Sequence, residues 1–252
     1  LTGVSVGAAL AGPAASVLSP RGLIALNVAT LALSALLARA LPSATGAAGE
    51  SAASPAGSGA RLRVEDPVVR GLFVRFLLVA FWQGFHTVAV TVIPLRLLDG
   101  GTRLVGVFVA ASAVAVFAGS LAALPAQRYL DHVPSAVWLV LPMAPLLAAV
   151  LAASTVPTLV LYAAFLMLFE VAFVHYNNRL LAAASARELS SVVTLRATLL
   201  PSGVAVSILV MGALSDLAGP VPAVLVVVVT TLAVSAATSG SRQTRRGPVP
   251  EA

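Results

Sequence analysis

Glu170 and Arg196 are the first candidates for chemistry, because both lie inside long apolar stretches of the sequence. Ionisable side chains at membrane depth are costly and are usually functional. Glu170 lies about eight residues and Arg196 about seven residues from the same side of two consecutive expected helices, which is roughly 12 Å and 10 Å at 1.5 Å per residue. The matching depths predict that the two can pair. The functional hypothesis is a proton-sensitive pair that breaks and reforms; the alternatives are a static ion pair, or an Arg196 side chain that extends to the headgroups.

Trp82, Gln83 and His86 form a second group of candidates within the apolar stretch 72–98. At about 100° per residue, Trp82 and His86 share one helix stripe with Arg75, and Gln83 lies at its edge. We expect the stripe to face a wet cavity, where His86 binds substrate or carries a proton and Trp82 stacks on a flat substrate. The alternatives are a neutral His86 bonded to a neighbouring carbonyl and a packing role for Trp82. Arg75 lies one turn into the helix, and we expect it to extend to the headgroups.

The end of the stretch 157–178 adds one more candidate. Asn177 follows Glu170 by seven residues and shares its helix face, which places it at the inner mouth of a pathway. For His175 and Tyr176 we expect anchoring at the membrane interface.

Membrane-spanning helices must position these side chains. Hydrophobic residues make up 59% of the 252 residues and charged residues only 10%, with a mean hydropathy of +1.01, whereas a soluble domain carries roughly a quarter charged residues. A helix needs about 20 apolar residues to cross the hydrocarbon core. Eight stretches meet this need: about 1–18, 22–41, 72–98, 104–125, 135–154, 157–178, 189–213 and 219–238. The predicted fold class is an all-α polytopic membrane protein with about eight transmembrane helices.

The chain divides by composition into four parts. Residues 1–42 hold two expected helices, residues 43–70 form a flexible linker rich in Ser, Ala and Gly, residues 71–238 hold six helices, and residues 239–252 form a disordered tail. Twelve of the 15 arginines lie in or beside the linker, the tail and two loops on the same side. Because arginines concentrate in the cytoplasm, we expect a multi-pass protein of the cell (inner or plasma) membrane with a cytoplasmic linker and C-terminus.

Small residues and a proline characterise the first expected helix. Gly7, Gly12 and Pro13 lie within six positions of one another along it. Small residues allow two helices to approach closely in lipid, and Pro13 removes a backbone hydrogen bond and favours a bend.

Two further motifs lie where expected helices end. Arg128 and Asp131 follow the stretch 104–125, and Gly212 and Asp216 precede the last expected helix. Asp131 can cap the next helix or hold a neighbouring arginine and so latch one conformation; the alternative is an ordinary turn residue. For Gly212 and Asp216 we favour ordinary packing and turn roles.

These motifs, the linker and the arginine distribution together resemble a transporter of the major facilitator superfamily. The segment 7–13 is similar to the Gly-x-x-x-Gly-Pro signature of the fifth helix in antiporters of that family, with Ala8 where glycine is expected. The segment 128–134 resembles the Asp-Arg-x-Gly loop between helices eight and nine. The segment 212–219 is similar to the Gly-x-x-x-Asp-x-x-Gly turn between the last two helices.

The resemblance implies that the eight expected helices are the family's fifth to twelfth and that four more precede them in a full-length chain. It also implies that the helix holding His86 lines a central path. The expected function is proton-coupled efflux of a small organic or drug-like molecule by alternating access between two halves. Apolar cavity walls favour lipophilic substrates over sugars. The alternatives are a nutrient importer of the same fold and a truncated, non-transporting membrane scaffold.

Other function classes lack sequence support. The chain has no cysteine and only three histidines, so we expect no metal site and no cofactor. It has no Gly-x-Ser-x-Gly elbow and no phosphate-binding loop, so we do not expect an enzyme. The arginines are scattered between apolar runs and form no patch for nucleic acid. The expected partners are the lipid bilayer, a small-molecule substrate and protons.

Overall fold

The computed structural model describes residues 64–130 and 132–240, which belong to one compact unit. Every regular element in these ranges is a helix. Six helical segments are long and apolar enough to cross a membrane, as expected for a multi-pass membrane protein.

Some predictions fall outside the described residues. These are the two helices within residues 1–42, together with Gly7, Gly12 and Pro13, the linker as far as residue 63, Asp131, and the tail from residue 241.

Each of the six apolar stretches predicted after residue 71 corresponds to one span. In chain order the helices are α3 (Pro67–Val92), the π-helix η1 (Ile93–Leu97), α4 (Gly101–Leu130), α5 (Ser135–Val140), α6 (Met143–Ala152), α7 (Thr155–Ala183), α8 (Leu189–Ala218) and α9 (Pro220–Gly240). α3 and η1 form one span, and so do α5 and α6. Several helices are longer than predicted; α4, for example, continues through Pro125 to Leu130.

Local sequence explains where several helices begin and end. Asp66 caps α3 by accepting a hydrogen bond from the backbone N–H of Val68 at 2.7 Å, and Pro67 occupies the first helical position, where its missing N–H costs nothing. Ala153 adopts a left-handed conformation after α6, close to the break predicted before Pro157. Gly219 has φ +89° between α8 and α9, a conformation that glycine adopts without strain.

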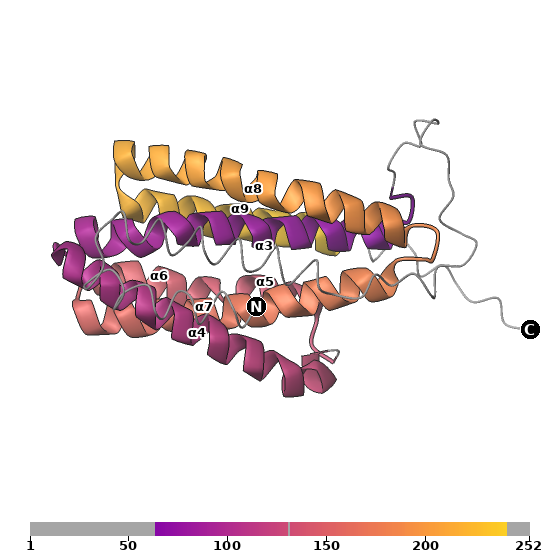
Figure 1. The fold of residues 1–252 in the computed structure, drawn as a ribbon, viewed down its shortest axis with the longest axis horizontal. Helices are drawn as coiled ribbons and strands as arrows, with labels where there is room; N and C mark the ends of the chain where they lie inside the picture. The colour runs from indigo at the N-terminus through magenta and orange to yellow at the C-terminus, as the bar shows by residue number, and fades with distance from the viewer. Residues whose placement is uncertain (1–63, 131, 241–252) are drawn as a thin grey trace, which may run out of the picture. The chain divides into compact units, whose positions relative to one another are not determined.

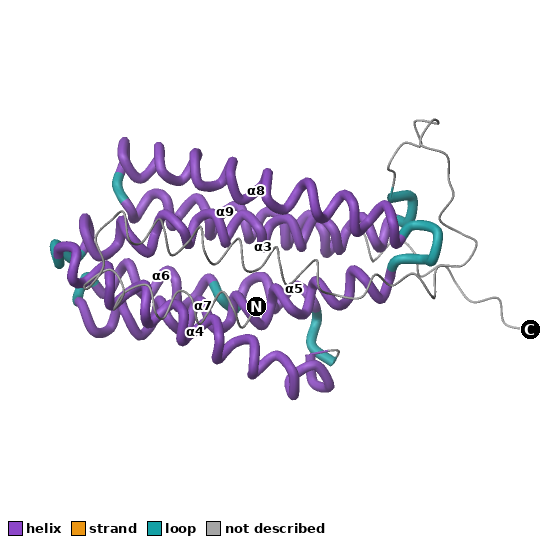
Figure 2. The backbone as a smooth tube through the Cα atoms, in the orientation of Figure 1, coloured by secondary structure: helices purple, strands orange, loops and turns teal. Residues whose placement is uncertain are grey.

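The helices run alternately back and forth, but chain neighbours are not always spatial neighbours (Figure 1). α8 packs against α3 and α9, whereas α7 packs against α4, α6 and α3. The turns that join the helices gather at the two ends of the bundle (Figure 2). The two most extensive interfaces, α3–α8 and α4–α7, therefore join helices that run in the same direction.

Aromatic rings fill the interface between α3 and α7. The ring pairs are Phe76–Phe173, Trp82–Phe169, Phe85–Phe165 and His86–Tyr162, with centroids 5.5, 6.3, 6.4 and 5.9 Å apart. Residue numbers fall along α7 as they rise along α3, as antiparallel packing requires. Such pairs add about 0.5–1.5 kcal/mol each beyond the area they bury, and they fix the register of the two helices.

Two glycines allow parallel helices to pack closely against each other. A Cβ added at Gly84 of α3 would lie 2.5 Å from Ser207 Cβ of α8, and one added at Gly119 of α4 would lie 2.6 Å from the carbonyl oxygen of Met167 on α7. Ser207 Oγ also donates a hydrogen bond to the carbonyl of Phe81 at 2.7 Å. Because lipid supplies no hydrophobic drive between helices, such small-residue contacts and interhelical hydrogen bonds hold the bundle together.

Candidate functional site

Glu170 lies on α7 and points toward α4. Only 3% of its surface is exposed, and its Oε1 accepts a hydrogen bond from Ser120 Oγ at 2.9 Å. A Cβ added at the neighbouring Gly119 would lie 2.8 Å from Glu170 Cβ. The carboxyl group therefore lies within the packed α4–α7 interface.

Arg196 does not pair with Glu170. It is half-buried on α8, and its guanidinium lies 5.5 Å from the ring centroid of Phe76 on α3, a cation–π contact. The predicted pair assumed that α7 and α8 face each other because they follow each other in the chain. Since α8 packs on α3 and α9 instead, the matching depths do not bring the two charges together.

His86 links α3 to α7. Its Nδ1 lies 2.8 Å from the hydroxyl of Tyr162, which is buried. The short hydrogen bond is thus made to a side-chain hydroxyl and not to a neighbouring carbonyl. The residue as a whole is half-buried, and its role in binding substrate or a proton stays a prediction.

Trp82 and Arg75 do not face a wet cavity, as was expected for their stripe of α3. Trp82 is fully buried and donates from Nε1 to Thr231 Oγ1 of α9 at 2.9 Å, so it is a packing residue. Arg75 is 4% exposed; its Nε donates to Thr238 Oγ1 of α9 at 3.0 Å and its Nη1 donates to Ser135 Oγ. The expectation that Arg75 extends to the headgroups was wrong, because α9 packs along this side of α3.

Gln83 is the exposed member of the predicted group. It lies at the edge of the stripe, as expected, and points away from the α9 side that buries Trp82. Thr87 and Thr91 follow it at intervals of four residues and are also exposed.

Asn177 is half-buried near the end of α7. Its Nδ2 lies 3.5 Å from Asn178 Oδ1, and its own Oδ1 is buried with no hydrogen-bond partner among residues 64–130 and 132–240. This unpaired oxygen fits the prediction of a polar contact at this end of a pathway, which stays a prediction.

His175 and Tyr176 are buried inside the bundle, so the expectation that they anchor α7 at the membrane interface was wrong. The hydroxyl of Tyr176 donates to the carbonyl of Ser135, and the ring of His175 lies 6.1 Å from that of Trp138. Both residues hold the start of α5 against α7.

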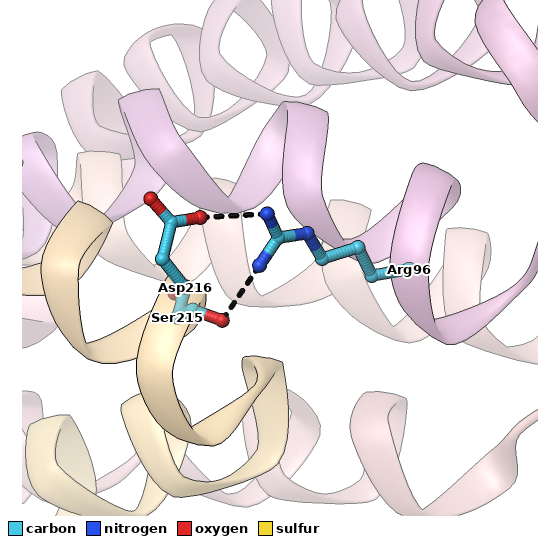
Figure 3. A network of polar contacts seen from close by, with 3 residues as sticks. All are labelled: Arg96, Ser215 and Asp216. Atoms are coloured by element: carbon cyan, nitrogen blue, oxygen red, sulfur yellow. Dashed lines mark hydrogen bonds and ion pairs between the residues drawn. The ribbon is translucent and has the colours of Figure 1, made fainter.

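An ion pair joins η1 to the end of α8 (Figure 3). Arg96 Nη2 lies 2.7 Å from Asp216 Oδ1, and Nη1 donates to the carbonyl of Ser215 at 2.9 Å. Sequence reasoning named Asp216 but missed Arg96; the available signal was that both lie on the side with few arginines. A Cβ added at Gly212 would meet nothing within 4 Å, so this glycine does not fill the close-packing role that was expected of it.

We expect Asp216→Asn to lower the free energy of unfolding by no more than about 1 kcal/mol, because exposed ion pairs contribute little. The two side chains are 47% and 67% exposed. The measurement is an SDS titration of the detergent-solubilised protein. Arg96→Gln and the double variant are measured as well, so that the four proteins form a double-mutant cycle. A loss above about 2 kcal/mol would show that the pair holds the two helix ends far more firmly than its exposure allows.

Arg128 lies in the last turns of α4, which extends to Leu130, and not in a loop as its motif suggested. Its expected partner Asp131 lies outside the described residues. A latch between this segment and a neighbouring helix stays a prediction.

Glu188 ties the start of α3 to the loop between α7 and α8. Its Oε1 accepts hydrogen bonds from the backbone N–H groups of Asp66 and Glu65, both at 3.0 Å, and its Oε2 accepts one from Ser185 Oγ at 3.1 Å. The backbone hydrogen bonds from Asp66 and Glu65 lower the pKa of Glu188 below its ordinary value.

The lowered pKa of Glu188 predicts a pH-dependent contribution to stability. Because the folded-state pKa lies below the unfolded value of about 4.3, the contribution is complete above that pH and is lost as pH falls through the folded pKa. We expect a small stability difference between the wild type and Glu188→Gln at pH 7 and 5 that is smaller at pH 3. Denaturation of both proteins at these three pH values measures it; a difference that grows on acidification contradicts it.

Comparisons with known proteins returned no match: no family model, no curated protein and no solved structure matches this chain.

Proposed function

We propose that this chain is a secondary transporter of small organic molecules that works by alternating access, with α3–α9 as one of its two halves. The observation that carries the proposal is the packing order of the six spans. α3, α4 and α5/α6 form a first group of three, and α7, α8 and α9 form a second. Because each group has an odd number of spans, the second enters the membrane from the opposite side.

The contacts between the two groups of helices come in equivalent pairs. α3 packs on α8 as α7 packs on α4, and α3 packs on α9 as α7 packs on α6. The first helices of the groups, α3 and α7, also pack on each other, and so do the last, α6 and α9. This reciprocal pattern is what an inverted repeat produces, and inverted repeats are a common building plan of secondary transporters.

The two parallel interfaces share two features. Each has a glycine at which an added Cβ would clash with the facing helix, Gly84 of α3 in one and Gly119 of α4 in the other. Each has a serine hydroxyl that donates across it: Ser207 to the carbonyl of Phe81 at 2.7 Å, and Ser120 to Glu170 at 2.9 Å. The difference is that only the second contains a carboxyl group, which supports Glu170 as the site where a proton is bound and released.

Everted vesicles from cells that produce the protein test the proposal. The vesicles are energised so that their interior becomes acidic, and acridine orange reports the proton gradient while candidate compounds are added. We expect at least one compound to dissipate the gradient in vesicles that contain the protein and not in vesicles that lack it. If none does, and right-side-out vesicles show no gradient-driven uptake either, a non-transporting membrane scaffold replaces the transporter.

The importer of the same fold remains the second candidate. Gln83 favours it, because an exposed amide at membrane depth suits a polar nutrient better than a purely lipophilic compound. Uptake into right-side-out vesicles driven by an inward proton gradient distinguishes the importer from the exporter.

A further inference from the structure

A strip of three polar side chains runs along the exposed side of α3. Gln83, Thr87 and Thr91 recur every four residues and are all exposed, so they lie on one side of the helix. Gln83 lies 16 residues from Pro67 and 14 from Leu97, the ends of its span, which at 1.5 Å per residue is about 24 Å and 21 Å. The strip therefore begins near the middle of the membrane.

Gln83 has polar atoms that its own helix does not satisfy. Thr87 Oγ1 donates to the backbone carbonyl of Gln83 at 3.0 Å, but the side-chain amide of Gln83 and the hydroxyl of Thr91 have no hydrogen-bond partner within the part of the chain that the structure describes. An amide in hydrocarbon without a partner is costly. This side of α3 therefore requires water or a polar ligand.

Exposed hydroxyls on α8 make the contrast clear. Thr198 Oγ1 donates to the carbonyl of Thr194 at 3.1 Å, and Ser202 Oγ donates to the carbonyl of Thr198 at 2.8 Å. Hydroxyl groups satisfied within their own helix can face lipid. Within the strip, the requirement for a polar neighbour therefore concerns the amide of Gln83 and the hydroxyl of Thr91, since Thr87 is satisfied by its own helix.

The strip lies between the sides of α3 that face α7 and α8. His86, one residue before Thr87, bonds Tyr162 of α7, and Gly84, one residue after Gln83, packs on Ser207 of α8. At about 100° per residue the positions of the strip fall between these two directions. The strip, on a helix of the first group, is thus bordered by two helices of the second group of the proposed repeat.

No charged side chain belongs to the strip. Arg75 is turned toward α9 and α5, Arg96 pairs with Asp216 at the end of the span, and His86 bonds Tyr162. A buried charge needs a fixed partner of opposite sign, and the strip offers only an amide and hydroxyl groups.

We infer that Gln83, Thr87 and Thr91 form a water-facing binding strip that recognises a neutral, hydrogen-bonding solute such as a polyol or an amide, and not an ion. The inference rests on the proposed transport function and specifies its substrate class. This substrate class differs from the lipophilic one expected from the apolar composition of the helices. Composition does not show that Gln83 is exposed and that its amide has no partner among the described residues.

Thiol labelling tests the strip directly, because the chain contains no cysteine and each single-cysteine variant carries one thiol. The variants are Gln83→Cys and Thr87→Cys, with Val229→Cys of α9 as the control, since Val229 is 62% exposed on an apolar helix. Each full-length protein is reconstituted in liposomes and treated with three methanethiosulfonates of similar size: a neutral one, a trimethylammonium and a sulfonate.

We expect the neutral reagent to modify positions 83 and 87 and to leave position 229 unmodified. We also expect the ratio of cationic to anionic rates to stay within about tenfold of the ratio for a free thiol in solution, because a fixed charge within about 10 Å would shift it further. Thiols at 83 and 87 as unreactive as that at 229 would overturn the water-facing strip. A ratio shifted by more than about tenfold would overturn recognition of a neutral solute.

The labelling does not depend on transport. If no compound dissipates the proton gradient but positions 83 and 87 are modified, the proposed function fails and the strip stands. If compounds dissipate the gradient but both thiols are unreactive, the strip fails and the transporter stands.

Discussion

Glu170→Gln is expected to abolish proton-driven flux while leaving the protein folded. Glutamine keeps the size of the side chain and can still accept the hydrogen bond from Ser120 Oγ, which lies 2.9 Å from Glu170 Oε1. It cannot bind and release a proton. Loss of a group that transfers a proton typically costs about 100-fold or more in rate, and we expect a loss of that size in gradient-driven transport. The measurement is the initial rate of gradient dissipation in everted vesicles, for a compound identified with the wild type.

Two control variants separate loss of the proton site from loss of structure. Ser120→Ala removes the hydrogen bond but keeps the carboxyl group, so we expect a smaller loss of rate and a changed dependence on pH. Glu188→Gln removes a carboxylate in the loop between α7 and α8, and we expect no loss. Full gradient-driven transport by Glu170→Gln, with normal size-exclusion behaviour, would exclude Glu170 as the coupling group.

The spans were predictable because their signal is local. A stretch of apolar residues long enough to cross the hydrocarbon core forms a helix whatever its neighbours are, since backbone groups in lipid must bond internally. The break near Ala153 also has a local signal, because the nearby Pro157 suits the start of a helix and not its interior. The length of α4 was underestimated, because Pro125 does not end that helix.

The neighbours of each helix were not predictable from its own residues. Periodicity placed Trp82 and His86 on one stripe with Arg75, but it cannot tell which helix that stripe meets. In the structure α9 covers Trp82 and Arg75, whereas α7 meets His86. The single predicted stripe therefore splits in the structure: one part packs against α9, and the other part meets α7 and is a candidate binding side.

Depth along a helix was equally insufficient. Glu170 and Arg196 have matching depths, but one faces Ser120 of α4 and the other faces Phe76 of α3. Conversely, the pair between Arg96 and Asp216 was not predicted, because the two residues are distant in sequence. In both cases the deciding information is which helices are adjacent, and that is set by non-local contacts such as those at the two glycines.

Gly119→Ala is expected to destabilise the bundle by about 1–3 kcal/mol, the usual cost of forcing extra volume into a packed interface. The added Cβ would lie 2.6 Å from the carbonyl oxygen of Met167 and 2.8 Å from Glu170 Cβ. A helix carbonyl cannot move aside alone, so α4 and α7 must separate. The separation would also draw Ser120 away from Glu170, and we therefore expect transport to fall with stability.

Gly106→Ala is the matched control for Gly119→Ala, because it lies on the same helix and its Cβ would meet nothing within 4 Å. Alanine is the better helix former by about 1 kcal/mol, so this variant should be neutral or slightly stabilised in an SDS titration. Gly84→Ala, whose Cβ would lie 2.5 Å from Ser207 Cβ, should also lose stability, since the added Cβ has no more room there than at Gly119. Equal stability of Gly119→Ala and Gly106→Ala would contradict close packing at Gly119, and equal stability of Gly84→Ala and Gly106→Ala would contradict close packing at Gly84.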